Sequence, residues 1–161
     1  DRAYIDAKQD GWSKKPIVEM LIPSTLDESL APKGKHVASL FCQQFSPSLQ
    51  DGKSWHDYRL AAADTIIETV TEHAPNFRSS ILGVMILSPL DLEEKFGLIG
   101  GDIMHGQMTL DQMWAARPLL NYGDYRGPLK SLYMCGSGTH PGGGVTGQPG
   151  RNAAREILKD S

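Results

Sequence analysis

The chain has 161 residues, a formal net charge of -3, and hydrophobic residues at 40% of its positions. That length suits one domain, and that hydrophobic content suffices for a core. Acidic and basic residues are interspersed, with no basic block beyond Lys14 and Lys15, and no apolar run reaches the ~20 residues of a membrane span. These features argue against nucleic acid, an anionic membrane surface or a transmembrane segment as part of the function.

The two cysteines, Cys42 and Cys135, show neither the spacing nor the neighbouring histidines of a zinc site or a redox dithiol. We therefore expect no metal and two buried, reduced thiols, which are typical of a reducing intracellular compartment. The first residues show no recognisable signal or transit segment.

Three strands are expected in the first third of the chain. Residues 3–7 indicate a short strand, and residues 16–23 form a stronger candidate because prolines bound it. Residues 24–35 are a polar connection with room for one helical turn. Residues 36–45 are mostly apolar, which is typical of a strand covered on both faces.

One long helix is predicted next. Ser54, with Asp57 three residues later, is a variant of the capping box that begins helices, and Pro75 ends the pattern. Apolar residues recur at helical spacing between these limits: Leu60, Ala63, Ile67, Val70 and Ala74. A stripe of this width packs against a sheet.

A further strand and a short helix follow. Residues 80–87 are continuously apolar and predict an inner strand of a sheet. Ser88 and Pro89 are typical of a helix start, and the predicted helix runs to Phe96 and ends at Gly97.

Residues 98–128 are the least regular part, with one helical turn expected at residues 111–116. A loop of this length in a compact protein is usually functional. It is rich in methionine and aromatic residues, namely Met104, Met108, Met113, Trp114 and Tyr122. Two interpretations stay open for these side chains: they line an apolar substrate pocket, or they belong to a core.

The last thirty residues read as strand, glycine loop and helix. An apolar run at 132–135 predicts the strand, residues 136–150 are crowded with glycine, and a helix is expected from near Thr146. Four of its residues are expected to pack inward: Ala153, Ala154, Ile157 and Leu158. Glycine lets backbone N–H groups approach a ligand, and a helix start favours an anion, so this unit predicts one wall of a cofactor site.

The loop itself narrows the choice of cofactor. It lacks the lysine that a phosphate-gripping NTPase loop needs, which excludes that class. A G-x-G-x-x-G pattern is present at Gly142, Gly144 and Gly147, but it begins seven residues after Cys135 rather than directly after the strand. The unit is therefore not a primary dinucleotide-binding unit, although it can contact a nucleotide or flavin from another side.

Two stretches carry a family resemblance. LYMCGSGTHPGGGVTGQPG, at residues 132–150, resembles the C-terminal flavin-binding signature of the phytoene desaturase-like FAD-dependent oxidoreductases, which are related to amine oxidases and carotenoid isomerases. KFGLIGGDIMHGQMTLDQMWAARP, at residues 95–118, is similar to segments of the same family in the same order. The resemblance is strong in the second half of the chain and weak in the first.

The resemblance implies the C-terminal part of a larger flavoenzyme. The implied fold class is α+β: a mixed, mostly antiparallel sheet with helices on one face, followed by the C-terminal strand, glycine loop and helix. It is an incomplete FAD/NAD(P)-binding oxidoreductase fold that lacks its N-terminal nucleotide-binding half. Residues 1–130 would be a portion of the substrate domain and residues 131–161 the flavin-contacting part, within one structural unit.

Cofactor contacts are expected in two groups. Gly136, Ser137 and Gly138 would lie along the ribityl chain and pyrophosphate of FAD. The ring side would be formed by the residues that lead into the helix: Gly143, Gly144, Val145, Thr146 and Gly147. The helix start would stabilise the ring, which becomes anionic on reduction, by ~1 kcal/mol.

The catalytic residue is unknown, and the candidates are weak. His140 is either a base suited to neutral pH or a residue whose ring nitrogen orders the loop by bonding a backbone carbonyl. His105 is either a neighbour of substrate or flavin or a structural residue. Arg117 either binds a phosphate or carboxylate or forms a surface ion pair. Asp111 and Gln112 could anchor the irregular segment by hydrogen bonds to backbone.

Two functions follow. The first is hydride transfer from a hydrophobic substrate to FAD, with the N-terminal FAD-binding half as the necessary partner; the chain alone would bind FAD weakly and be inactive. The second is a flavoenzyme-derived regulatory or protein-interaction module without turnover. A mitochondrial location is suggested by the resemblance only.

Overall fold

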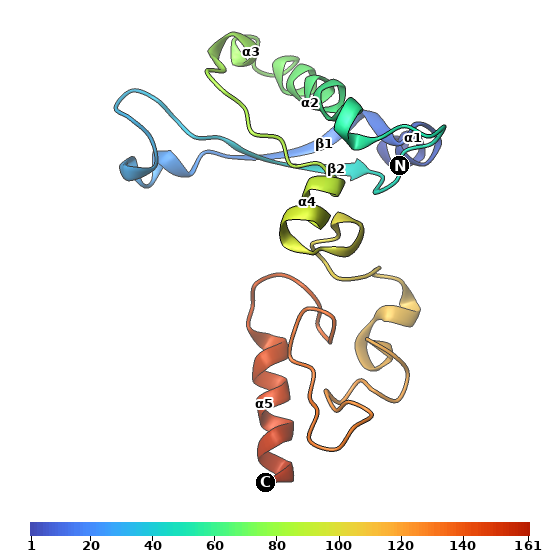
Figure 1. The fold of residues 1–161 in the computed structure, drawn as a ribbon. Helices are drawn as coiled ribbons and strands as arrows, with labels where there is room; N and C mark the ends of the chain where they lie inside the picture. The colour runs from blue at the N-terminus through green and yellow to red at the C-terminus, as the bar shows by residue number, and fades with distance from the viewer. The chain divides into compact units, whose positions relative to one another are not determined.

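The computed structural model describes all residues, 1–161, and contacts divide them into two compact units, Asp1–Leu92 and Glu93–Ser161 (Figure 1). The helices and strands are α1 (Arg2–Asp10), β1 (Trp12–Leu21), β2 (Ser39–Phe45), α2 (Trp55–Thr71), α3 (Phe77–Ser80), α4 (Pro89–Phe96) and α5 (Gln148–Asp160). Short 3-10 turns lie at Pro23–Thr25, Glu28–Leu30, Ile99–Gly101, Leu110–Gln112 and Trp114–Ala116. The helices are all too short or too polar to span a bilayer.

The sheet of the first unit is an antiparallel hairpin of β1 and β2. Ile17 pairs with Gln43 and Met20 with Leu40, and the register shifts between Trp12 and Ile17. The two predicted strands at 16–23 and 36–45 are therefore confirmed in essence. The expectation that the second is covered on both faces is wrong, because its side chains are half-buried or exposed.

Residues 3–7 belong to helix α1, not to a strand. Gly11 ends this helix in the left-handed conformation with φ 93°, and its N–H donates to the carbonyl of Ala7 at 3.1 Å. Glycine adopts this conformation without steric cost, so it is a strong stop signal. So short a segment, read by itself, does not reveal the helical period.

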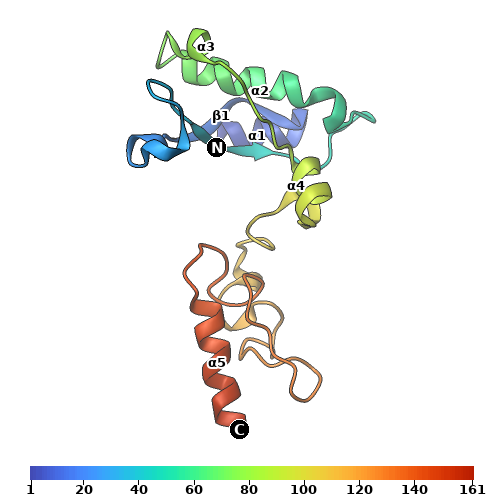
Figure 2. The same ribbon diagram turned by 60° about the vertical axis from the view of Figure 1, so that its left-hand side comes forward.

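Four aromatic side chains form the core of the first unit. Trp55, at the start of α2, is 4% exposed, and its ring centroid lies 5.8 Å from Trp12 and 6.2 Å from Phe45. Tyr58 lies 6.0 Å from Trp12, and the indole nitrogen of Trp55 donates to the carbonyl of Ser46 at 3.0 Å. This cluster packs α2 against β1, as predicted, and α2 lies along the hairpin in two views (Figures 1 and 2).

The buried face of α2 differs from the predicted stripe. Ala62 and Val70 are buried, whereas Leu60 is 68% exposed. The stripe through Leu60 is one position away from the face that the aromatic anchor selects. Trp55 and Tyr58, which a count of aliphatic residues ignores, decide the rotation of the helix because they bury the larger surface.

The start of α4 is the clearest local prediction that the structure confirms. The carboxylate of Asp91 accepts from the Ser88 N–H at 2.9 Å, and the Ser88 hydroxyl accepts from the Asp91 N–H at 3.2 Å. This reciprocal pair satisfies two donors of the helix start. Arg59 adds an ion pair to Asp91 at 3.4 Å, and Gly97 ends the helix with φ 68°.

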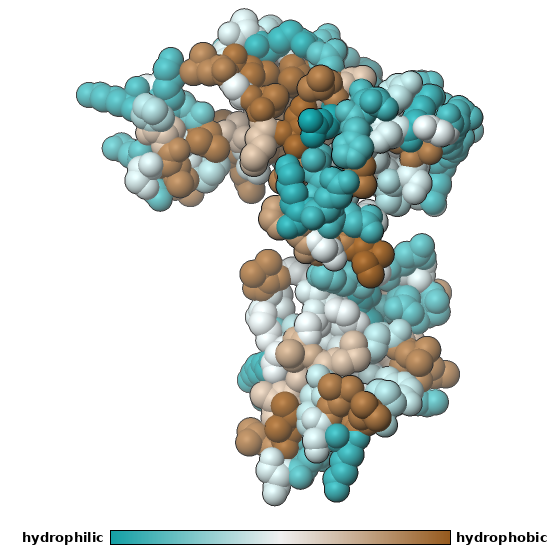
Figure 3. Space-filling view, in the orientation of Figure 1, coloured by the Kyte–Doolittle hydropathy of each residue, from teal (hydrophilic) through white to brown (hydrophobic).

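Residues 80–87 form no strand. Leu82, Val84 and Met85 are 77%, 61% and 81% exposed, and apolar surface lies along the path of this segment (Figure 3). Apolar content alone does not make a strand, because a strand also needs a neighbour that completes its hydrogen-bond ladder. The prediction of an inner strand is wrong for this structure.

The second unit consists mainly of loops, 3-10 turns and α5. The strand predicted at 132–135 is reduced to a single bridge between Arg126 and Tyr133. The mixed sheet expected from the sequence is therefore a two-stranded antiparallel sheet. The chain also forms two compact units where one was expected, and the functional boundary between residues 130 and 131 stays a prediction.

Helix α5 begins two residues later than expected. Gly147 precedes it with φ 69°, Pro149 lies in its first turn, and the hydroxyl of Thr146 accepts from the Gln148 N–H at 3.2 Å. Of the residues expected to pack inward, only Ala153 is buried. The other three are exposed: Ala154, Ile157 and Leu158.

Candidate functional site

The glycine loop begins with a rigid turn. Both the N–H and the hydroxyl of Thr139 donate to the carbonyl of Gly136, at 3.1 and 2.9 Å, and Thr139 is 1% exposed. The N–H of Gly142 donates in turn to the Thr139 carbonyl at 2.7 Å. The loop therefore holds its shape through its own hydrogen bonds.

Arg117 joins this loop to the irregular segment before it. Its side chain is buried, and one terminal nitrogen, Nη2, donates to the carbonyls of Met104, His105 and Ser137 at 3.1, 3.0 and 2.9 Å. The two stretches that carry the family resemblance are thus brought together by one residue. The expected surface ion pair of Arg117 is wrong, because a buried guanidinium binds backbone carbonyls instead.

Two glycines allow the close approach of these stretches. A Cβ at Gly142, where φ is 93°, would lie 3.7 Å from the Arg117 guanidinium, and a Cβ at Gly143 would lie 3.0 Å from the sulfur of Met104. A larger residue at 143 would push Met104 away. Glycine here serves packing within the protein.

Gly136 and Gly138 have a different role. Neither has a positive φ, and a Cβ at either position would meet nothing within 4 Å. The fold therefore does not require glycine at these positions, yet their backbone is open to an approaching molecule. This bare surface fits a ligand that contacts backbone, such as the ribityl and phosphate groups expected here.

The remaining predicted contacts lie on the outer part of the loop. Val145 is fully exposed and has φ 55°, and Gly144 has φ 128°. Thr146 and Gly147 follow directly at the start of α5. Side chains and backbone in this stretch face away from the packed contacts at Gly142 and Gly143, so a ligand could reach them.

The carbonyl of His140 is fixed by a side chain that the sequence did not reveal. The Tyr125 hydroxyl donates to it at 2.9 Å and accepts from the Asn152 amide of α5 at 2.8 Å. The sequence interpretation assigned loop ordering to the ring of His140, whereas here the ordering acts through the carbonyl. No pattern marks Tyr125 or Asn152, because their partners are distant in sequence.

The ring of His140 helps to line a cavity of about 210 Å³ in the second unit. The full lining is Met108, Gln112, Met113, Trp114, Arg117, His140 and Pro141. Met108 and Trp114 are 59% and 61% exposed, so the interpretation as core is wrong for them. The use of this cavity for substrate stays a prediction. His105 is exposed and is not among the lining residues.

Gln112 anchors the irregular segment as expected. Its side-chain amide donates to the carbonyl of Pro118 at 3.2 Å, and its backbone carbonyl lies 3.4 Å from Nη1 of Arg117. Asp111 acts differently: a hydrogen bond from the Thr109 side chain lowers its pKa. The segment is thus held in place by polar contacts rather than by a core.

An ion-pair network holds the end of α5. The guanidinium of Arg126 binds Asp124, Glu156 and Asp160 at 3.0, 2.7 and 2.9 Å, and the Tyr133 hydroxyl donates to Asp160 at 2.7 Å. Hydrogen bonds from Arg126 and then Tyr133 hold the pKa of Asp160 below its usual value. This network stabilises the helix that follows the candidate site.

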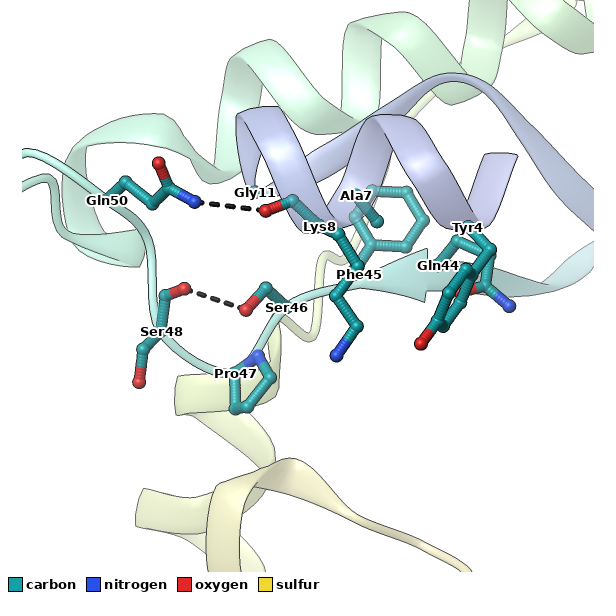
Figure 4. Close-up of a pocket in the computed structure, with 10 residues that line it drawn as sticks. All are labelled: Tyr4, Ala7, Lys8, Gly11, Gln44, Phe45, Ser46, Pro47, Ser48 and Gln50. Atoms are coloured by element: carbon teal, nitrogen blue, oxygen red, sulfur yellow. Dashed lines mark hydrogen bonds between the residues drawn. The ribbon is translucent and has the colours of Figure 1, made fainter. Parts of the chain in front are cut away.

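A cavity of about 200 Å³ in the first unit carries no candidate function (Figure 4). It lies between α1 and the end of β2, and its polar groups bond to each other. Gln50 donates to the Lys8 carbonyl at 3.0 Å and Ser46 to the Ser48 carbonyl at 2.7 Å. None of the predicted site residues lines it.

The cysteines are free, but burial differs from the expectation. Cys42 is half-buried, and burial raises its pKa to about 11. Cys135 is exposed, directly before the glycine loop. The prediction that both thiols are buried is wrong for Cys135.

Comparison with known proteins supports the family resemblance, although no family model matches the chain. The chain is 49% identical over 160 residues to "Pyridine nucleotide-disulfide oxidoreductase domain-containing protein 2" of Rattus norvegicus, covering 99% of this chain and 28% of that protein. It is 28% identical to a limonene dehydrogenase chain of Castellaniella defragrans over 98% of its own length, and 29% identical to the phytoene desaturase of Fusarium fujikuroi over 91%.

These matches confirm the resemblance seen in the motifs and extend it to the first half of the chain. The chain spans 28% of the length of the rat relative and 29% of the other two. The relatives are thus larger oxidoreductases, of which this chain resembles one portion.

Proposed function

We propose that this chain, similar along nearly its whole length to an oxidoreductase-domain protein and to a phytoene desaturase, is the C-terminal portion of an FAD-dependent oxidoreductase. Residues 131–161 would contact the flavin, and residues 1–130 would belong to the substrate domain. The N-terminal half that binds the adenosine diphosphate part of FAD is the partner that completes the site.

The observation that carries this proposal is the bare backbone at Gly136 and Gly138. Thr139 holds this turn rigidly, and Arg117 ties Ser137 to the carbonyl of Met104 and its neighbour. A rigid turn without side chains, in space that the fold leaves open, suits close contact with an extended polar ligand.

The residues present fit the proposed cofactor, which when bound supplies the two-electron acceptor for a hydride. Gly136, Ser137 and Gly138 would hold its ribityl and phosphate groups by backbone contacts. The stretch from Gly143 to Gly147 would face the ring, where the start of α5 adds ~1 kcal/mol of favourable interaction with negative charge.

The cavity beside the loop supplies the substrate side of the proposal. Its methionine and tryptophan side chains suit an apolar substrate, and the fixed carbonyl of His140 holds the loop in position. The His140 ring is the candidate group to hold or release a proton near neutral pH. The substrate is proposed to be hydrophobic.

The proposal is tested by Gly138→Val in the protein that carries both halves. The variant side chain meets nothing in the fold, so thermal stability without FAD should not change, whereas bound flavin absorbance should be lost. Gly83→Val is the matched control, since Gly83 also has no positive φ and open space around it but lies outside the loop. Normal flavin content in Gly138→Val would contradict the proposed contact.

A second candidate function is a regulatory or protein-interaction module without turnover. The exposed Leu82, Val84 and Met85 favour it, because an apolar surface of this kind is a possible contact for another protein. A colourless full-length protein that gains no thermal stability from added FAD would favour this function over the enzyme. The mitochondrial location stays a prediction, tested by imaging the full-length protein in cells.

A further inference from the structure

Arg117 is a buried cation without an acidic partner. It is 2% exposed, and none of the ion pairs in the structure includes it. Its Nη2 binds three carbonyls, and its Nη1 lies 3.4 Å from two more. The Nε–H, although buried, has no acceptor at all.

This arrangement satisfies most N–H groups and leaves the charge itself uncompensated. Carbonyl dipoles accept hydrogen bonds but carry no net charge, and a buried ion without a counter-ion is strongly destabilising. A buried guanidinium with a free N–H therefore indicates that an anionic group completes its surroundings when the protein is in its working state.

The charge lies directly behind the glycine loop. A Cβ on Gly142 would be 3.7 Å from both Nε and Cζ of Arg117, so no side chain separates the guanidinium from the loop backbone. Gly143 and Gly144 follow at once, and this is the stretch proposed to face the flavin ring. The unpartnered N–H thus lies on the side of Arg117 that borders the loop.

We propose that Arg117 is a positioning residue that also sets the charge at the flavin: it holds the loop against the segment at 104–107, and its positive charge stabilises the negative charge that the ring gains on reduction. This inference rests on the proposed function. Stabilising the reduced, anionic form raises the reduction potential, which favours removal of a hydride from substrate.

The charge and the hydrogen bonds of Arg117 can be separated by two substitutions. Arg117→Gln removes the charge, and Arg117→Lys keeps a charge but loses the planar fork that binds several carbonyls. The exposed Arg155 of α5 provides the control Arg155→Gln. Because burial lowers the pKa of lysine, the potentials are best compared at mildly acidic pH, where the new lysine stays protonated.

The measurement is the reduction potential of the bound flavin in the protein that carries both halves. Arg117→Gln should lower it by at least a tenfold change in the equilibrium constant, which is about 30 mV for a two-electron couple. Arg117→Lys should keep most of the wild-type potential while losing thermal stability, and Arg155→Gln should change neither. Equal potentials in wild type and Arg117→Gln, with flavin bound in both, would overturn the inference and leave the proposed function standing.

The wild-type protein provides a test that does not depend on how the variants fold. If the reduced ring stays anionic, reduction takes up one proton for two electrons, and the potential falls by about 30 mV per pH unit on both sides of neutrality. A slope twice as steep below neutral pH shows a protonated ring and overturns the inference. Absence of flavin from the wild-type protein would instead overturn the proposed function, and this inference with it.

Discussion

The hydroxyl of Tyr125 donates a hydrogen bond to the backbone carbonyl of His140 at 2.9 Å, and both partners lie far from any regular sheet. Tyr125 is 9% exposed and is linked on its other side to Asn152 of α5. One phenol therefore connects the irregular segment, the glycine loop and the last helix. In a unit with so little secondary structure, such single contacts carry much of the order.

Tyr125→Phe should destabilise the second unit by about 1–2 kcal/mol. The change leaves the His140 carbonyl and the Asn152 amide without a partner, and unmet hydrogen bonds in buried places cost about this much. Urea denaturation of the chain measures the effect. Tyr122→Phe is the control, since its hydroxyl takes part in none of the hydrogen bonds of the structure; equal losses for both variants would contradict the assignment.

The rotation of α2 is tested by a pair of alanine substitutions. Trp55→Ala should cost about 3–5 kcal/mol, because it removes a buried ring that contacts Trp12 and Phe45. Leu60→Ala should change stability by less than about 0.5 kcal/mol, since the side chain is 68% exposed. Denaturant midpoints measure both, and a larger loss for Leu60→Ala would restore the face predicted from the aliphatic stripe.

This helix shows what the sequence could and could not predict. Its N-cap, its length and its packing on a sheet follow from local rules, and Ser54 does cap it by accepting from the His56 N–H. Its rotation depends on Trp12 and Phe45, which reach it from the hairpin. The capping box of α4 was predictable for the same reason that the α2 cap was: both partners are three residues apart.

The candidate site was predicted as a motif but not as a structure. The two resembling stretches and the glycine loop were visible in the sequence, whereas the role of Arg117 was not, because its carbonyl partners carry no residue-specific signal. The predicted strand at 80–87 failed for a different reason. Its composition suits a strand, but strand formation depends on a second segment whose presence the local sequence does not report.

Acid should weaken the second unit through the network around Arg126. Hydrogen bonds from Arg126 and Tyr133 lower the pKa of Asp160, and bonds from Lys159 and then Arg126 lower that of Glu156. Both carboxyls bind protons more weakly in the folded chain than in the unfolded chain. Their stabilising effect is therefore complete above the ordinary carboxyl pKa of about 4 and is lost as the pH falls through the folded values.

Stability measured by denaturation at a series of pH values checks this dependence. Arg126→Gln should flatten the acid limb of the curve, whereas Arg155→Gln should keep it. Added salt should also flatten the wild-type curve, since the groups are at the surface. An unchanged acid limb in Arg126→Gln would show that other carboxyls govern acid unfolding.

The two thiols should react with iodoacetamide at very different rates. Near neutral pH, Cys42 holds almost no thiolate because burial raises its pKa to about 11, whereas Cys135 is exposed. Mass spectrometry of the native chain should find label on Cys135 first, and Cys135→Ser should remove nearly all early labelling. The denatured chain serves as control, with both sites labelled; equal native rates would show that Cys42 is not protected.

The uncovered run at residues 80–87 has a practical consequence for anyone who handles this chain by itself. It contains neither charge nor proline and, with Leu82, Val84 and Met85 on the outside, it matches the profile of segments that stack between molecules. Yield from expression should thus fall at high protein concentration, and Val84→Lys should recover monomer in light scattering. In a cell, the same run would present quality-control chaperones with a binding sequence whenever nothing else covers it.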